Sequence, residues 1–214
     1  MTIRAIYFDV GETLVDETRQ WGLWADFLGV PRFTFFAVLG GVIQAGRHHR
    51  EIFKYFDADF DYESAQGRFC AAGGNYEFLE SDFYPDVQPS LHALRTTGMI
   101  IGIAGNQPKE CEGALRKAGI QADLLASSSS LRVEKPAEAF FTRLTEMASL
   151  PPQEIVYVGD RYDNDIVPAA NVGMVPVLIR RGPWAHLHGP SDKLGAARAI
   201  IDSLEELPPL LKEL

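Results

Sequence analysis

The stretch "IRAIYFDVGETL", residues 3–14, joins an apolar run to a polar turn. A short run rich in isoleucine and aromatic residues that ends at a turn is typical of a strand buried on both faces of a parallel sheet. Asp9 stands at the end of this run, and Gly11 and Glu12 follow it closely. Asp9 is therefore either a reactive carboxylate at the edge of a sheet or a carboxylate that only forms a turn.

Four similar apolar runs follow along the chain, with longer amphipathic segments between them. The runs are MIIGIAG (99–105), LLASS (124–128), IVYVGD (155–160) and VPVLIR (175–180). The helix-like segments are residues 87–98, 108–119, 136–150 and 203–214, the last one weakened by Pro208 and Pro209. This alternation predicts an α/β fold with a Rossmann-like parallel sheet and right-handed crossovers.

Residues 16–83 interrupt the alternation, because they contain no convincing buried strand. The segment 31–47 opens with a proline and carries apolar residues at helical spacing. We expect its own small core to contain Phe33, Phe35, Phe36, Val38, Leu39, Val42 and Ile43. The sequence thus predicts a core domain of residues 1–15 and 84–214, with a mostly helical domain inserted at 16–83.

Composition narrows the classes of partner. The 214 residues are 46% apolar, which is enough for a buried core, and their formal net charge is −9. Because this charge repels phosphate backbones and anionic lipid, we expect neither nucleic acid nor a membrane as a partner. Two cysteines without metal-ligand spacing and an N-terminus unlike a signal peptide predict a cytoplasmic location. The oligomeric state stays open.

Polar residues follow the ends of the predicted strands. In open parallel sheets ligands bind at the carboxyl ends of the strands, so these residues are the candidate site. They are Asp9, Thr13, Gly105, Asn106, Asp160, Asp163 and Asp165, and the loop before the helix-like segment 136–150 adds Lys135. The order of the runs brings two acidic clusters, a lysine and an asparagine to one edge.

Crowded carboxylates repel one another unless a cation lies between them, and Mg²⁺ binds carboxylates together with water and substrate phosphate. Asp9 and Asp160 suit such a site. A carboxylate beside the metal can attack phosphorus and form an aspartyl phosphate, while Lys135, Thr13 and Asn106 neutralise or bind the phosphate oxygens. The metal screens the repulsion between nucleophile and substrate.

Four motifs resemble, in order and spacing, those of the haloacid dehalogenase-like (HAD-like) hydrolases: FDVGETL, GIAGN, EKP and VGDRYDNDI. The resemblance covers residues 3–15 and 84–182. It implies a hydrolase, in most members a Mg²⁺-dependent phosphatase, with residues 16–83 as the cap that selects a small phosphorylated substrate. The implied roles are Asp9 as nucleophile, Lys135 as charge neutraliser, Thr13 and Asn106 as phosphate contacts, and Asp160 and Asp165 as metal or metal-shell residues.

Two positions depart from the family pattern. Phosphatases of the family carry a second aspartate where this chain has Gly11, so the side chain that protonates the leaving group is missing. The backbone carbonyl of Gly11 keeps the metal-ligand role that the resemblance implies for this position. Glu12 stands where glycine is usual and is a candidate substitute acid. Gly105 replaces a serine or threonine, so a backbone N–H is left to contact phosphate.

These departures leave alternatives open. A 2-haloacid dehalogenase needs no metal, but it would lack the acidic cluster at Asp160. A phosphonatase would need a cap lysine, for which Lys54 is a formal candidate, although an exposed helix lysine is the simpler interpretation. A catalytically weakened phosphate-binding protein is the third alternative. Asp163 is interpreted as a surface or capping carboxylate, and the basic residues 47–50 as a solvated helix face.

Overall fold

The computed structural model describes residues 2–74, 77–189 and 195–214. The chain forms two compact units. Unit 1 comprises Met1–Asp16 and Phe78–Leu214, and unit 2 comprises Glu17–Glu77.

The described part of unit 1 contains a parallel sheet of six strands in the order β3-β2-β1-β4-β5-β6. The strands are β1 (Ala5–Phe8), β2 (Ile100–Gly105), β3 (Leu124–Ser127), β4 (Ile155–Gly159), β5 (Val175–Ile179) and β6 (Ala199–Ile201). The predicted α/β fold with a parallel sheet is confirmed. The first five strands lie in the five apolar runs, whereas β6 was not predicted.

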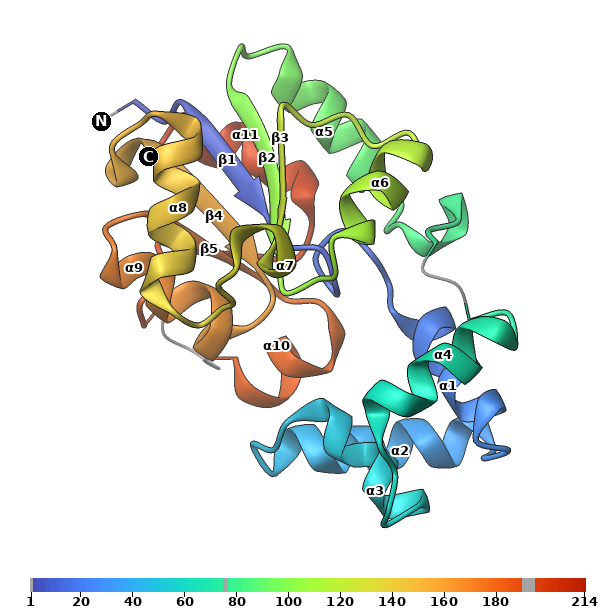
Figure 1. Ribbon diagram of the computed structural model, residues 1–214. Helices are drawn as coiled ribbons and strands as arrows, with labels where there is room; N and C mark the ends of the chain where they lie inside the picture. The colour runs from blue at the N-terminus through green and yellow to red at the C-terminus, as the bar shows by residue number, and fades with distance from the viewer. Residues whose placement is uncertain (1, 75–76, 190–194) are drawn as a thin grey trace. The chain divides into compact units, whose positions relative to one another are not determined.

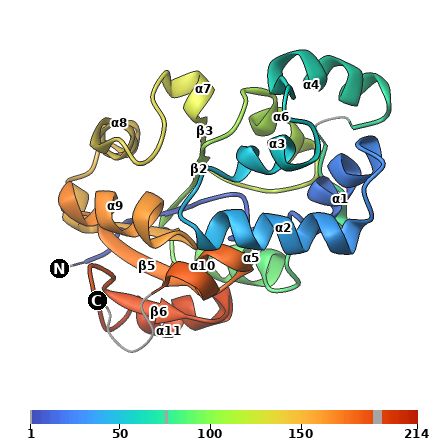
Figure 2. The same ribbon diagram turned by 90° about the horizontal axis from the view of Figure 1, so that it is seen from below.

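Helices cover both faces of the sheet (Figures 1 and 2). One face carries α8 (Glu138–Ala148) and α9 (Val167–Asn171), and the other carries α5 (Val87–Arg95) and α11 (Leu207–Leu210). Because β1 and β4 are buried on both faces, their residues are apolar without alternation. Tyr7 and Tyr157 face α8, and each buried hydroxyl donates a hydrogen bond to a backbone carbonyl.

Shorter elements complete unit 1: α6 (Glu110–Lys117), α7 (Ser128–Leu131), α10 (Gly182–His188), the 3-10 helices η2 (Glu80–Asp82), η3 (Pro152–Glu154) and η5 (Leu204–Glu206), and the π-helix η4 (Tyr162–Ile166). Three of the helix-like segments in the sequence contain α5, α6 and α8. The predicted C-terminal helix is reduced to η5 and the four residues of α11. Pro208 and Pro209 donate no backbone N–H, which shortens it.

The segment 78–83, which the sequence analysis assigned to the insertion, lies in unit 1. Its last residue, Phe83, forms an antiparallel bridge with Val15. The amide of Asp16 also donates a hydrogen bond of 2.7 Å to the carbonyl of Asp82. These backbone bonds tie the segment to the chain that leaves β1.

Within its described residues, 17–74 and 77, unit 2 contains helices and connecting turns but no strand. It contains α1 (Thr18–Phe27), α2 (Arg32–Gln44), η1 (His49–Ile52), α3 (Phe53–Phe56) and α4 (Tyr62–Ala71). Its core is aromatic: the ring of Trp24 stacks on Phe69 at 3.7 Å between centroids, and Phe53 stacks on Phe60 at 4.6 Å.

Helix α2 buries Phe35, Leu39, Val42 and Ile43 on one face, as expected from their helical spacing. The prediction for Phe33 is wrong, because this side chain is 86% exposed. Two residues before Phe35, it projects from a different side of the helix.

Among the described residues no single helix is both long and apolar enough to cross a membrane. The pair α1 and α2 meets the length and composition test together, with a bend of 113° between them.

Candidate active site

The carboxyl ends of β2, β1 and β4 lie side by side, and each is followed or closed by a candidate residue. Gly105 closes β2, Asp9 follows β1 and Asp160 follows β4. The amide of Asp9 donates a hydrogen bond of 2.9 Å to the carbonyl of Val158 in β4. The parallel order therefore brings together residues that are far apart in the sequence.

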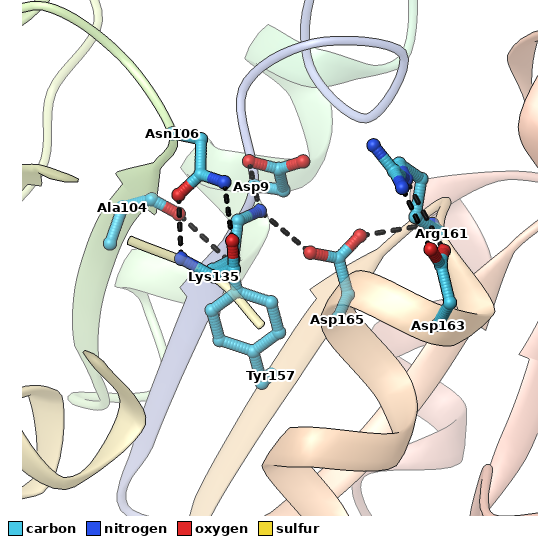
Figure 3. A network of polar contacts seen from close by, with 8 residues as sticks. All are labelled: Asp9, Ala104, Asn106, Lys135, Tyr157, Arg161, Asp163 and Asp165. Carbon is cyan, nitrogen blue, oxygen red and sulfur yellow. Dashed lines mark hydrogen bonds and ion pairs between the residues drawn. The ribbon is translucent and has the colours of Figure 1, made fainter. Parts of the chain in front are cut away.

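Lys135 lies between two of the carboxylates (Figure 3). Its Nζ is 2.7 Å from Oδ1 of Asp9 and 2.6 Å from Oδ1 of Asp165, and its side chain is 1% exposed. Burial by itself lowers the pKa of Lys135, but the charges of Asp165 and Asp9 raise it well above its ordinary value. Lys135 is therefore an ammonium ion that holds both carboxylates.

Asp9, Asp160 and Asp165 form a compact acidic cluster. Each offers one carboxylate oxygen, and these atoms lie within 4.8 Å of one another. Burial raises the pKa of Asp160 well above its ordinary range, and the neighbouring Asp165 and Asp9 raise it further. Burial also raises the pKa of Asp165, to about 6, against the opposing effect of Lys135. A cation at this cluster would favour the ionised forms.

The oxygens of the cluster differ in their partners. Asp165 accepts a hydrogen bond from Lys135 through Oδ1 and one of 2.9 Å from the amide of Arg161 through Oδ2. Oδ2 of Asp160 is buried and has no hydrogen-bond partner within the described residues. Since a buried carboxylate oxygen without a partner is costly, this atom is the clearest position for a bound cation.

Asn106 contacts the backbone of Lys135 twice. Its Nδ2 donates to the Lys135 carbonyl at 2.8 Å, and its Oδ1 accepts from the Lys135 amide at 2.7 Å. The sequence analysis expected a phosphate contact from Asn106 and did not foresee these bonds. They orient the loop that carries Lys135, and Asn106 itself remains exposed.

Thr13 is fully buried, and its Oγ1 has no hydrogen-bond partner in the part of the chain that the structure describes. Its backbone carbonyl accepts a hydrogen bond of 2.8 Å from Nη1 of Arg181.

Gly105 is required by a close approach of Asp9. A Cβ at position 105 would lie 2.5 Å from Oδ1 of Asp9, which is shorter than any ordinary contact. With Asp9 bound to Lys135 in this way, the serine or threonine of the family pattern would displace the carboxylate. The replacement noted in the sequence thus has a steric reason.

Gly11 and Glu12 form the turn after β1. Gly11 forms an isolated bridge with Val15, and Glu12 has a positive φ of 51°, a conformation that glycine adopts more easily. The buried carboxylate of Glu12 accepts a hydrogen bond of 2.7 Å from the hydroxyl of Tyr84. Glu12 is therefore engaged by Tyr84, which weighs against its use as the substitute acid.

Other candidates lie at the surface. The side chain of Asp163 is 66% exposed and pairs with Arg161 at 2.8 Å, as expected for a surface carboxylate. Lys54 is exposed in α3 of unit 2. Arg47 pairs with Glu51 within unit 2.

Sequence reasoning missed Arg181 and Asp86. Their side chains are 8% and 12% exposed and form an ion pair. Arg181 follows β5 by two residues, so the rule of inspecting strand ends applies to it as well. The predicted run VPVLIR ends at Arg180, one residue before Arg181.

Comparisons with known proteins agree with these observations. A family model described as HAD-hydrolase-like matches residues 133–207. Glyceraldehyde 3-phosphate phosphatase from Methanopyrus kandleri is 35% identical over 134 residues, covering 58% of this chain and 57% of that protein. Haloacid dehalogenase-like hydrolase domain-containing protein 3 from Danio rerio is 29% identical, covering 61% and 53%. The chain thus spans little more than half the length of these relatives.

A solved structure of a HAD phosphatase from Thermococcus onnurineus matches over almost the whole chain. The sequences are 26% identical, the match covers 98% of each chain, and the TM-score is 0.63.

Proposed function

Because the chain belongs to the haloacid dehalogenase-like hydrolases, we propose that it is a Mg²⁺-dependent phosphatase acting on a small phosphorylated metabolite. One observation carries the proposal: the Lys135 ammonium bridges Asp9 and Asp165, and both carboxylates belong to the buried cluster completed by Asp160. This arrangement combines a candidate nucleophile, a cation site and a fixed positive charge. Phosphoryl transfer requires all three.

The donor set fits Mg²⁺, because oxygen ligands from buried carboxylates are what this ion prefers. Asp9 and Asp160 would hold it directly, with the Gly11 carbonyl and Asp165 completing its surroundings. The unpartnered Oδ2 of Asp160 supports this assignment. When bound, Mg²⁺ supplies positive charge that screens the repulsion between Asp9 and the anionic phosphate.

In the proposed reaction a carboxylate oxygen of Asp9 forms a bond to phosphorus while the bond from phosphorus to the leaving oxygen breaks, and the leaving oxygen takes a proton from solvent. The product is an aspartyl phosphate. Water then attacks phosphorus, its proton passes to solvent, and inorganic phosphate leaves as the Asp9 carboxylate is restored. Lys135 keeps its positive charge throughout and stabilises the charge on the transferred group.

We assign the remaining phosphate contacts to Thr13, Gly105 and Asn106. The Thr13 hydroxyl has an unused donor, and Gly105 offers a backbone N–H. The amide of Asn106 retains a second hydrogen beside the one given to Lys135. Thr13 follows β1, Gly105 is the last residue of β2, and Asn106 follows it.

We further propose that unit 2, Glu17–Glu77, acts as the cap that selects the substrate. The relatives named glyceraldehyde 3-phosphate phosphatase support a small phosphorylated compound as that substrate. A cytoplasmic setting is part of the proposal, since Cys70 and Cys111 are not joined by a disulfide. No nucleic acid or membrane partner is proposed.

A catalytically weakened phosphate-binding protein is the second candidate. The observation in its favour is that Gly11 has no side chain to protonate the leaving group, while Glu12 is engaged by Tyr84. Such a protein would bind phosphate with Mg²⁺ but turn over slowly.

A panel of phosphomonoesters, acyl phosphates and 2-haloacids, assayed with Mg²⁺ and with a chelator, tests the proposal. Mg²⁺-dependent release of phosphate that is lost in Asp160→Asn supports it. Asp163→Asn is the matched control, because Asp163 is an exposed carboxylate of the same segment. Halide release that is unaffected by chelator would instead identify a dehalogenase, and Mg²⁺-dependent phosphate binding without turnover would identify the binding protein.

A further inference from the structure

Arg181 is a buried arginine that contacts the turn after Asp9. Its Nη1 donates a hydrogen bond of 2.8 Å to the backbone carbonyl of Thr13, and its Nη2 donates to Oδ2 of Asp86. The side chains of Arg181 and Asp86 are 8% and 12% exposed. Since a buried charge needs a partner, burial keeps Arg181 and Asp86 paired with each other.

Asp86 is itself fixed by the C-terminal part of unit 1. Its Oδ2 also accepts hydrogen bonds of 2.8 Å from the hydroxyl of Ser203 and 2.9 Å from the amide of Leu204. Ser203 and Leu204 begin the turn of η5. Arg181 is therefore anchored to the body of the unit on one side and to the Thr13 carbonyl on the other.

Tyr84 links Arg181 to Glu12, the residue before Thr13 in the turn. Arg181 lies over its ring, with the guanidinium carbon 4.3 Å from the ring centroid, and the Tyr84 hydroxyl donates to Glu12. Gly182 leaves room for this arrangement, because a Cβ there would lie 2.6 Å from the Cβ of Glu12. Tyr84 thus holds the side chain of Glu12, and Arg181 holds the backbone carbonyl of Thr13.

The turn is short, and backbone hydrogen bonds close it directly after Asp9. The amides of Leu14 and Val15 both donate hydrogen bonds of 2.9 Å to the carbonyl of Val10, which directly follows Asp9. The Thr13 carbonyl bound by Arg181 belongs to this closed turn. A displacement of Thr13 would therefore displace Asp9 as well.

We propose that Arg181 is a positioning residue for the proposed phosphatase, with Asp86 as its counter-ion: it holds the turn so that Asp9 stays aligned for attack on phosphorus. The inference rests on the proposed function of Asp9. Arg181 makes no contact with the acidic cluster among the interactions found for the described residues, so it acts through the backbone of Thr13.

Arg181→Lys tests the inference, because one ammonium group cannot reproduce the two separated N–H contacts of a guanidinium fork. We expect kcat on an aryl phosphate to fall about 10- to 100-fold, as small misplacements of a reacting group do, while KM stays nearly unchanged. Arg180→Lys is the matched control. Arg180 is the adjacent arginine and pairs with Asp202 through two bonds of 2.7 Å, but its side chain is 44% exposed.

A merely structural role is distinguished by counting competent molecules from the stoichiometry of Mg²⁺-dependent beryllium fluoride binding, which requires no turnover. If the variant's loss of rate equals its loss of competent molecules, the positioning role is wrong. Unchanged kcat in Arg181→Lys would also overturn it. Asp86→Asn, which keeps the size of the side chain, provides a second variant should Arg181→Lys not fold, and it should lower kcat at constant KM.

Failure of the proposed function gives a different pattern. Beryllium fluoride mimics a phosphoryl group on an aspartate, and its Mg²⁺-dependent binding is measured without turnover. Wild-type protein that neither hydrolyses the aryl phosphate nor binds this probe would overturn both proposals. Wild-type protein that does both, beside an Arg181→Lys variant that matches it, would overturn the role of Arg181 alone.

Discussion

The carboxylate of Asp9 has two neighbours that define its position, the ammonium of Lys135 and the α-carbon of Gly105. The ion pair with Lys135 holds the Asp9 carboxylate beside the cluster. Gly105 allows the carboxylate to lie against the backbone of β2. Gly105 and Lys135 are 96 and 126 residues from Asp9 in the sequence. Single substitutions at Asp9 and Gly105 test these contacts.

Asp9→Asn should reduce turnover by about 10⁴-fold or more, because the amide is a far poorer nucleophile than the carboxylate. The fold should persist, since the substitution keeps the size of the side chain and removes a charge that repels Asp160. Steady-state rates and circular dichroism measure the two effects. Turnover at the wild-type rate would exclude Asp9 as the nucleophile.

Gly105→Ala should lower kcat about 10- to 100-fold, because the new Cβ would push the Asp9 carboxylate away from its position. Gly113→Ala is the control: Gly113 lies in α6 and has no atom within 4 Å of its would-be Cβ. We expect this control to keep full activity and to gain a little stability from the better helix propensity of alanine. Equal rates for the two variants would contradict the steric role of Gly105.

At the scale of elements, the turn after β1 combines two unusual choices. Gly11 stands where the family pattern has an aspartate, so an acidic side chain is missing there. Glu12 adopts a left-handed backbone conformation, which costs a residue with a Cβ about 1–2 kcal/mol. The hydrogen bond that Glu12 accepts from Tyr84 offsets part of that cost. In the proposed reaction, Asp9 would therefore attack without an acidic side chain at position 11 to protonate the leaving group.

We therefore expect aryl and acyl phosphates to react much faster than alkyl phosphates, by up to the roughly 10²- to 10⁴-fold that a general acid contributes. Good leaving groups depart without a proton, whereas alkoxides need one. Gly11→Asp should raise alkyl phosphate turnover and leave aryl phosphates little changed, as measured by single-turnover rates.

Similar chemical-step rates for alkyl and aryl phosphates in the wild type would show that another group donates the proton. A selective loss of alkyl turnover in Glu12→Gln would then identify Glu12 as that acid, in spite of its bond with Tyr84.

At the scale of the whole molecule, the acidic cluster links stability to pH and to metal. Burial raises the pKa values of Asp160 and Asp165 in the folded state, the latter to about 6. The folded state then binds more protons than the unfolded state at mildly acid pH. In the metal-free protein this contribution to stability is present at low pH and is lost as pH rises through the folded-state pKa values.

We expect the thermal midpoint of chelator-treated protein to fall between about pH 4 and pH 7, and Mg²⁺ to raise it increasingly over the same range, because the ion binds the ionised carboxylates. Calorimetry with Mg²⁺ and with chelator measures this difference. Asp160→Asn should remove most of the Mg²⁺ effect, whereas Asp163→Asn should retain it. A Mg²⁺ effect that is independent of pH would contradict the assignment of the cluster.

The sequence by itself determined the elements whose signal is local. Continuous apolar runs identified β1 to β5, because strands buried on both faces need apolar side chains at every position. Helical spacing identified α2 and α8, and the order of the runs brought Asp9 and Asp160 to one edge. The pairing of Asp9 with Asp160 followed from strand ends, whereas Lys135 followed from the loop before residues 136–150 and from the family resemblance.

Only the tertiary structure decided the rest, because it depends on partners distant in the sequence. The three residues of β6 are too few for a periodic signal and are a strand through their pairing with β5. The bonds from Asn106 to Lys135 join residues 29 apart, and Arg181 binds Thr13 across 168 residues. Such contacts leave no local pattern, since each residue type is also common at a solvated surface, and burial beside a specific partner exists only once the chain has folded.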